Sequence, residues 1–170
     1  MNDNSTTTMM DYAAAVARAR AAEHLNEWAG TFLDALVSAA SVQVFHANIL
    51  FIRPNDRERH QITITGFVHQ RKIVLRYDHV LIRKNNQLGG RIRFNLSEGN
   101  DEKTLVSVVF DAQGDACFEG EKIIHHMKLT SDVSLVRRPT SESGSLEELQ
   151  KQILNRLTAS VQKGLDVVDM

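Results

Sequence analysis

The sequence holds one cysteine and two prolines, and each shortage excludes a class of protein. Cys117 has no second cysteine to pair with, so an intramolecular disulfide is excluded and a reducing compartment is expected. Two prolines and nine glycines in 170 residues exclude collagen-like and proline-rich disordered chains. No window approaches the roughly 18 consecutive apolar residues of a membrane-spanning helix. The sequence therefore predicts a soluble, cytoplasmic protein that does not enter a membrane.

Motifs of the common enzyme and metal-site classes are also missing. The chain has no GxSxG, GxxxxGK[ST] or GxGxxG, the signatures of nucleophile-elbow hydrolases, P-loop NTPases and dinucleotide-binding folds. None of its seven histidines has HExxH spacing, and the adjacent His125 and His126 would point to opposite faces of a strand. We therefore predict no metal site, no cofactor and no catalytic residue. A non-enzymatic role is favoured over an enzymatic one.

Composition and the first forty residues predict one domain that begins with a helix. A hydrophobic fraction of 42% in 170 residues supports a single core, which we place in residues 11–170, after a polar, disordered tail at 1–10. Residues 11–40 are rich in alanine, and large apolar side chains recur every three or four positions in their second half, as in a helix packed on a core. The first half offers only Tyr12, Val16 and alanines. It is interpreted either as a surface for a partner or a second copy, or as a helix exposed to solvent.

Residues 41–136 have the alternation of apolar and polar side chains that is typical of strands. Segments rich in valine, isoleucine and phenylalanine are separated there by short polar or glycine-containing turns. No helical pattern lies between them, which favours an antiparallel meander of six to eight strands over a parallel sheet. We expect this sheet to be strongly curved. Keeping Tyr77 and Val80 on one face requires a shift of register, so a bulge is predicted at Asp78 and His79.

The remaining residues predict a linker and a second helix. Residues 137–145 contain proline, glycine and serine, a composition typical of linkers. Ser145, with Glu148 three positions later, is a capping box that opens a helix over residues 146–168. The predicted fold class is therefore α+β: an N-terminal helix, a curved antiparallel sheet and a long C-terminal amphipathic helix. The narrow apolar stripe of the second helix is interpreted as a face for a partner, formed by Leu149, Ile153, Leu157 and Val161.

Positive charge is concentrated in residues 69–94, which contain seven basic side chains and one acidic one. The segment is predicted to form two neighbouring strands. If Arg76 lies opposite Arg91 or Arg93, like charges about 5 Å apart oppose strand pairing unless a negative group lies beside them. That group is either a ligand or an acidic part of this chain. The candidates within the chain are Asp78, Glu98 and Asp101. The predicted basic binding face consists of Arg71, Lys72, Arg76, Arg83, Arg91 and Arg93.

These features favour a non-enzymatic binding or adaptor protein, resembling secretion chaperones in the order of its elements but in no motif. It is expected to form homo-oligomers or to dock a protein partner through its helices and the basic sheet face. One alternative is a protein that binds an anion, a nucleotide or a nucleic acid on the basic strands. Another is a small enzyme with a pocket lined by the sheet. No pattern in the sequence identifies the partner or ligand.

Overall fold

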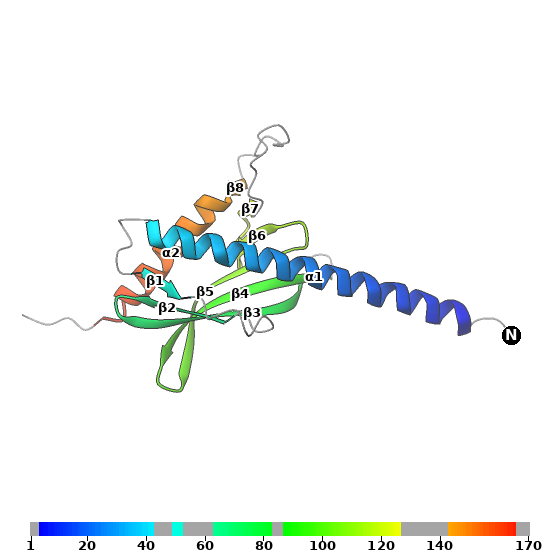
Figure 1. The fold of residues 1–170 in the computed structure, drawn as a ribbon, viewed down its shortest axis with the longest axis horizontal. Helices are drawn as coiled ribbons and strands as arrows, with labels where there is room; N and C mark the ends of the chain where they lie inside the picture. Colours follow the sequence, from blue (N-terminus) through cyan, green and yellow to red (C-terminus); the bar gives the residue numbers. More distant parts are fainter. Residues whose placement is uncertain (1–3, 43–48, 53–62, 83–86, 127–142, 166–170) are drawn as a thin grey trace, which may run out of the picture.

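The computed structural model describes residues 4–42, 49–52, 63–82, 87–126 and 143–165, and it places two helices and eight strands within them (Figure 1). Helix α1 is Asn4–Val42 and helix α2 is Leu146–Gln162. The strands are β1 (Ile49–Ile52), β2 (Thr63–Val68), β3 (Arg71–Ile82), β4 (Gln87–Glu98), β5 (Asp101–Phe110), β6 (Asp115–Phe118), β7 (Ile124–His126) and β8 (Ser143–Ser145).

The strands form one sheet in which spatial order follows chain order, from β1 to β8. Every neighbouring pair from β1 to β7 is antiparallel, which confirms the predicted α+β class and the antiparallel meander. The last pair, β7 with β8, is parallel, which the sequence did not predict. A parallel pair needs a long connection that returns the chain to the same end of the sheet, and residues 127–142 connect these two strands.

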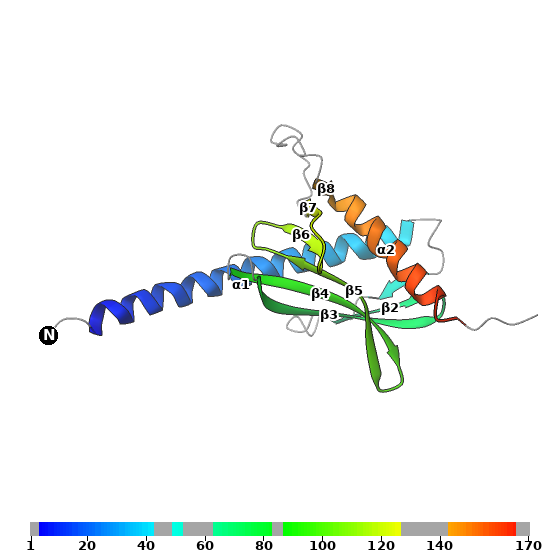
Figure 2. The same cartoon turned by 180° about the vertical axis from the view of Figure 1, so that it is seen from behind.

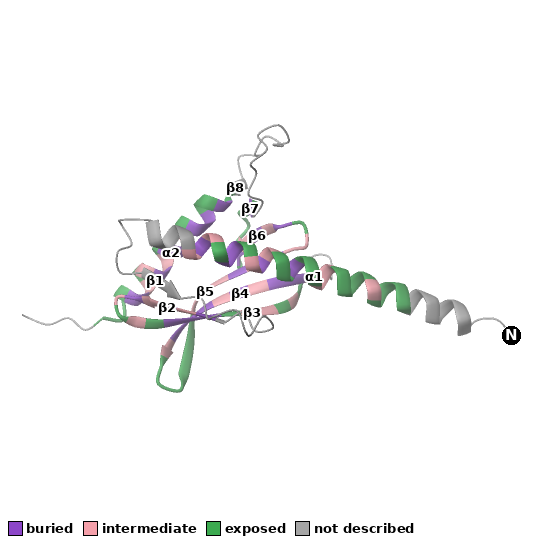
Figure 3. Cartoon of the chain, in the orientation of Figure 1, coloured by how far each residue is buried: buried purple, intermediate pink, exposed green. Residues whose placement is uncertain are grey.

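Both helices lie on the same face of the curved sheet, as two opposite views show (Figure 1 and Figure 2). The helices and the inner face of the sheet enclose one hydrophobic core (Figure 3). Phe32 of α1, Phe94 of β4 and Phe110 of β5 are among its largest fully buried side chains. Tyr77 packs against this core from β3, so the side chains of Tyr77 and Phe94 both face inward. Within the described residues, no helix is both long and apolar enough to cross a membrane.

Several element boundaries differ from those predicted. Helix α1 begins at Asn4, so residues 4–10 continue the helix instead of forming a disordered tail. Residues 4–10 contain no alanine, and they extend a helix that is already nucleated by packing of its second half, which costs less than starting a new helix. At the other end of the chain, Ser143–Ser145 pair as β8 within the segment predicted to be a linker. Residues 43–48, at the start of the region predicted to form strands, and residues 137–142 of the predicted linker lie outside the described residues.

The capping box is confirmed, although the helix it opens is shorter than predicted. Ser145 is the N-cap of α2, and its Oγ accepts a hydrogen bond from the backbone N–H of Glu148 at 3.2 Å. The helix ends at Gln162 rather than at residue 168. Gly164 follows within two residues, where low helix propensity favours termination. Residues 166–168 of the predicted helix lie outside the described part of the chain.

The bulge predicted at Asp78 and His79 is wrong, because β3 and β4 pair in unbroken register from Ile73 to Ile82. His79 therefore stays on the inner face beside Tyr77, with ring centroids 5.4 Å apart. Its ring is exposed, and Asn26 of α1 places its Oδ1 3.1 Å from His79 Nε2. The register shift that does occur lies between β4 and β5, at Phe94 and Asn95.

Trp28 links α1 to the turn between β5 and β6 through a hydrogen bond. Its indole Nε1–H donates a hydrogen bond to the carbonyl oxygen of Ala112 at 3.1 Å. Gly114 in the same turn has φ of +85°, a conformation that side-chain-bearing residues rarely adopt, and a Cβ there would lie 3.2 Å from the indole ring. The turn and the tryptophan therefore fit only because this position is glycine. This contact fixes where α1 crosses the sheet.

Candidate functional site

The outer face of the sheet, opposite the helices, carries the predicted cluster of arginines. Arg76 of β3 lies directly opposite Arg93 of β4, and Asp78 lies opposite Arg91. The predicted meeting of like charges across the two strands is therefore confirmed. Two like charges in adjacent strands oppose pairing unless they are neutralised. What neutralises them decides whether this face is free to bind a ligand.

Asp78 neutralises two of these arginines. One of its carboxylate oxygens, Oδ2, accepts a hydrogen bond from Arg91 Nη2 at 2.6 Å. The other, Oδ1, forms an ion pair with Arg93 Nη2 at 3.1 Å. Glu119 of the segment after β6 adds a longer ion pair to Arg91, at 3.7 Å. The side chains of Arg91, Arg93 and Asp78 are each about one quarter to one third exposed, so water screens these pairs only in part.

Glu102 of β5 neutralises Arg76, and sequence reasoning missed this residue. Its two carboxylate oxygens accept hydrogen bonds from Nε and Nη2 of Arg76. Oε2 also accepts a hydrogen bond from the amide of Asn95 at 3.0 Å. These bonds from Arg76 and Asn95 favour the charged form and lower the pKa of Glu102 to about 2. The β4–β5 register determines this approach, and that register shifts at the bulge beside Asn95.

The other members of the predicted basic face are not part of this network. Arg71 forms an ion pair with Glu98 at 2.8 Å and donates a second hydrogen bond to the carbonyl oxygen of Gly164, beyond the end of α2. Lys72 is exposed and forms no ion pair with a described residue. Arg83 lies outside the described residues. The argument for an external anion therefore no longer applies to Arg76, Arg91 and Arg93, because carboxylates of this chain already meet them.

The apolar stripe of α2 is not an exposed face for a partner, which corrects the interpretation made from the sequence. The four residues that define this stripe are 0 or 1% exposed and belong to the core of this chain: Leu149, Ile153, Leu157 and Val161. The helix crosses the inner face of the sheet, where its apolar side meets β5 and β2. The amphipathic pattern was correct, but it could not distinguish the inner face of this sheet from the surface of another protein.

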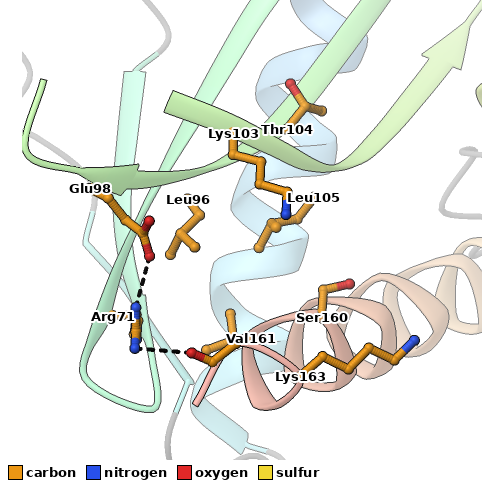
Figure 4. A pocket seen from close by; sticks show the side chains of 10 residues that line it. Arg71, Leu96, Glu98, Lys103, Thr104, Leu105, Ser160, Val161 and Lys163 are labelled. Atoms are coloured by element: carbon orange, nitrogen blue, oxygen red, sulfur yellow. Dashed lines mark hydrogen bonds and ion pairs between the residues drawn. The ribbon is translucent and has the colours of Figure 1, made fainter. Parts of the chain in front are cut away.

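A cavity of about 460 Å³ lies where the end of α2 meets β3, β4 and β5 (Figure 4). Leu96, Leu105 and Val161 form its apolar walls. Three basic side chains and one carboxylate surround it. These charged residues are Arg71, Lys103, Lys163 and Glu98. The lining includes no histidine, so it lacks the pairing of histidine and carboxylate that the pocket-enzyme alternative requires.

The histidines form no common site in the described part of the chain, where no group of three or more metal-ligating side chains comes together. His126 and Asp115 lie close, with Nδ1 and Oδ1 at 2.5 Å, but both are well exposed and lie away from the cavity. His125 points to the other face of β7 and is 1% exposed. Neither of its ring nitrogens has a hydrogen-bond partner among the described residues.

Burial lowers the pKa of His125 below its ordinary value of 6.5, and Arg156 acts in the same direction, while Glu148, the backbone of Ser145 and Glu121 oppose the shift. The folded protein therefore binds fewer protons than the unfolded chain once the pH falls below about 6.5. Stability contributed by neutral His125 is complete above that pH and is lost as the pH falls toward the lowered pKa. We expect the urea midpoint to fall between about pH 7.5 and about pH 5, and to fall less in His125→Leu. Equal pH dependence in the two proteins would contradict this role.

From Tyr12 to Arg20, α1 projects beyond the sheet (Figure 1 and Figure 3). Side chains from Tyr12 to Arg20 are exposed except for Val16, which is intermediate. Tyr12 is 72% exposed, the largest exposed fraction among the large hydrophobic residues of the described chain. From Leu25 onward, the core-facing side chains of the same helix are fully buried. The projecting half is therefore a surface that folding of this chain does not use.

Comparison of the chain with protein-family models, with curated proteins and with solved structures found no match.

Proposed function

We propose that this is a non-enzymatic binding or adaptor protein that self-associates through the projecting half of α1. The observation that carries the proposal is that this half is helical yet unpacked, while the core is filled and the arginines of the outer face have acidic partners. A helix gains most of its stability in proteins from packing one face. A helix that presents Tyr12, Val16 and several alanines to water on one side would gain stability from a partner that covers that side.

The surface that would be covered consists of Tyr12, Ala15, Val16 and Ala19, which we call the Tyr12 face. At 3.6 residues per turn these positions share one side of the helix, about a third of a turn away from the core-facing Leu25. The sheet of the same chain therefore does not cover the Tyr12 face. Its small alanines allow another helix to approach closely.

The Tyr12 face fits a second copy of itself in antiparallel orientation. A two-fold axis through the midpoint between Ala15 and Val16 places Tyr12 of each copy opposite Ala19 of the other. Each large side chain then meets a small one, as close packing of helices requires. The same operation pairs Ala15 with Val16. This self-complementarity favours a second copy over an unrelated helix as the first partner.

The test is the molecular mass in solution. We expect light scattering over a dilution series to give a mass above the 19.1 kDa of one chain at high concentration, with dissociation on dilution. Tyr12→Glu combined with Val16→Glu should give the mass of one chain throughout, because each copy would bring two desolvated charges to the contact.

The matched control is Ala13→Glu combined with Ala17→Glu, which adds the same charges at the same spacing on the other side of the helix. This variant should associate as the wild type does. A wild type that has the mass of one chain at every concentration would overturn the proposal, as would equal loss of association in both variants. Circular dichroism of both variants checks that α1 remains helical.

A further inference from the structure

We propose that the cavity beside the end of α2 binds a small organic carboxylate with an apolar tail. The cavity lies at the opposite end of the molecule from the projecting half of α1, so this inference does not depend on the proposed self-association (Figure 1). Its volume of about 460 Å³ is within the range of small-molecule sites, which extends from about 300 to about 1,000 Å³. The ligand class follows from the lining.

The apolar part of the cavity wall comes from three elements, and Thr104 and Ser160 add hydroxyl groups to the lining. Val161 of α2 is 1% exposed and Leu96 of β4 is 9% exposed, so both belong to the core and are held in place. Leu105 of β5 is the residue left without a partner at the register shift, where Phe94 pairs with Val106 and Asn95 pairs with Thr104. A bulge redirects a side chain. Leu105, the extra residue of this bulge, lines the cavity.

The charges at the cavity are mainly positive. Arg71 is held by Glu98 at 2.8 Å and by the carbonyl oxygen of Gly164 at 3.2 Å. Lys103 and Lys163 form no ion pair with any described residue. Figure 4 shows Lys103 reaching from its strand into the space between the sheet and α2. The ammonium group of Lys103 thus remains available beside the apolar walls, whereas the end of the Lys163 side chain is directed along α2, away from Arg71 (Figure 4).

A single negative charge suits this cavity better than a multiply charged anion. The C-terminal end of a helix carries partial negative charge, and Gly164 directs its carbonyl oxygen to Arg71 at the cavity. That field opposes every added negative charge, so it disfavours a multiply charged phosphate group more than a carboxylate with a single charge. A carboxylate would meet Lys103, and its tail would cover the apolar walls. The expected ligand is therefore an amphipathic monocarboxylate.

The experiment is calorimetric titration of the full-length protein with octanoate. We expect saturable binding with one site per chain. Lys103→Glu combined with Lys163→Glu should raise the Kd at least about tenfold, because the lining then repels the carboxylate. Octylamine and inorganic phosphate should each bind at least about tenfold more weakly than octanoate to the wild type.

The matched control is Lys122→Glu combined with Lys151→Glu, which makes the same charge change at exposed lysines outside the cavity. Its Kd for octanoate should stay within about twofold of the wild type. Absence of saturable octanoate binding to the wild type would overturn the proposal. Equal weakening in the two lysine variants, or binding of octylamine as tight as that of octanoate, would overturn it too. Thermal unfolding of both variants verifies that each is folded.

Discussion

Leu157→Ala is expected to lower the free energy of unfolding by about 2 to 5 kcal/mol, measured by urea denaturation of the purified protein. Leu157 is 0% exposed and lies in the core between α2 and the sheet. Removing its side chain loses apolar burial and leaves a cavity that rigid neighbours fill only in part. The result would establish that the apolar side of α2 stabilises its own chain.

The control for this prediction is Asn155→Ala on the exposed side of the same helix. Both substitutions end in alanine, the best helix former, so helix propensity cannot account for a loss seen only at Leu157. Asn155→Ala should leave the free energy of unfolding within about 0.5 kcal/mol of the wild type or raise it slightly. If Leu157→Ala instead changed only the oligomeric mass and left stability unchanged, the stripe would be a partner face as the sequence first suggested.

Gly90→Ala is expected to lower the free energy of unfolding by about 1 to 3 kcal/mol, although it adds only one methyl group. A Cβ on Gly90 would lie 2.3 Å from Cζ of Phe110, whose ring covers the backbone of β4 at this point. Phe110 is 1% exposed and stacks on Tyr77 with ring centroids 6.1 Å apart, so it has no free space to move into. The added methyl must therefore displace core side chains.

Gly30→Ala is the control, and its expected effect on the free energy of unfolding has the opposite sign. No heavy atom lies within 4 Å of a Cβ placed on Gly30 in α1. The substitution should raise the free energy of unfolding by up to about 1 kcal/mol through helix propensity. In addition, Phe110→Leu should reduce the cost of Gly90→Ala when the two are combined, since the clash involves the ring. Additive effects of Gly90→Ala and Phe110→Leu would show that the clash is not the cause.

The acidic partners of the arginines could be predicted from the sequence only in part. The concentration of basic residues predicted that like charges meet across two strands, and Arg76 does lie opposite Arg93. Asp78 was recognised as an acidic partner because it is close in sequence. Glu102 was not, because its approach to Arg76 depends on the pairing of β4 with β5 and on the bulge between them. Register across a third strand is not encoded in any local pattern.

The projecting half of α1 and the cavity likewise differ in how much of each could be predicted from the sequence. The alanine-rich first half of α1 left two interpretations open, a surface for a partner or a solvent-exposed helix. The structure shows that its own chain does not cover it, and only an experiment on the oligomer distinguishes the two. The cavity had no sequence signal at all, since Arg71, Lys103 and Lys163 come from three separate elements.

By itself the sequence determined the fold class, the order of the elements, the capping box at Ser145 and the inward side of most strands. These features depend on neighbouring residues, through helix propensity, capping and the two- or 3.6-residue period of apolar side chains. Only the tertiary structure decided that α2 packs on its own sheet, that Glu102 meets Arg76 and that Gly90 lies beneath Phe110. Each of these contacts joins separate elements, and the energy that selects them arises only when all the elements pack together.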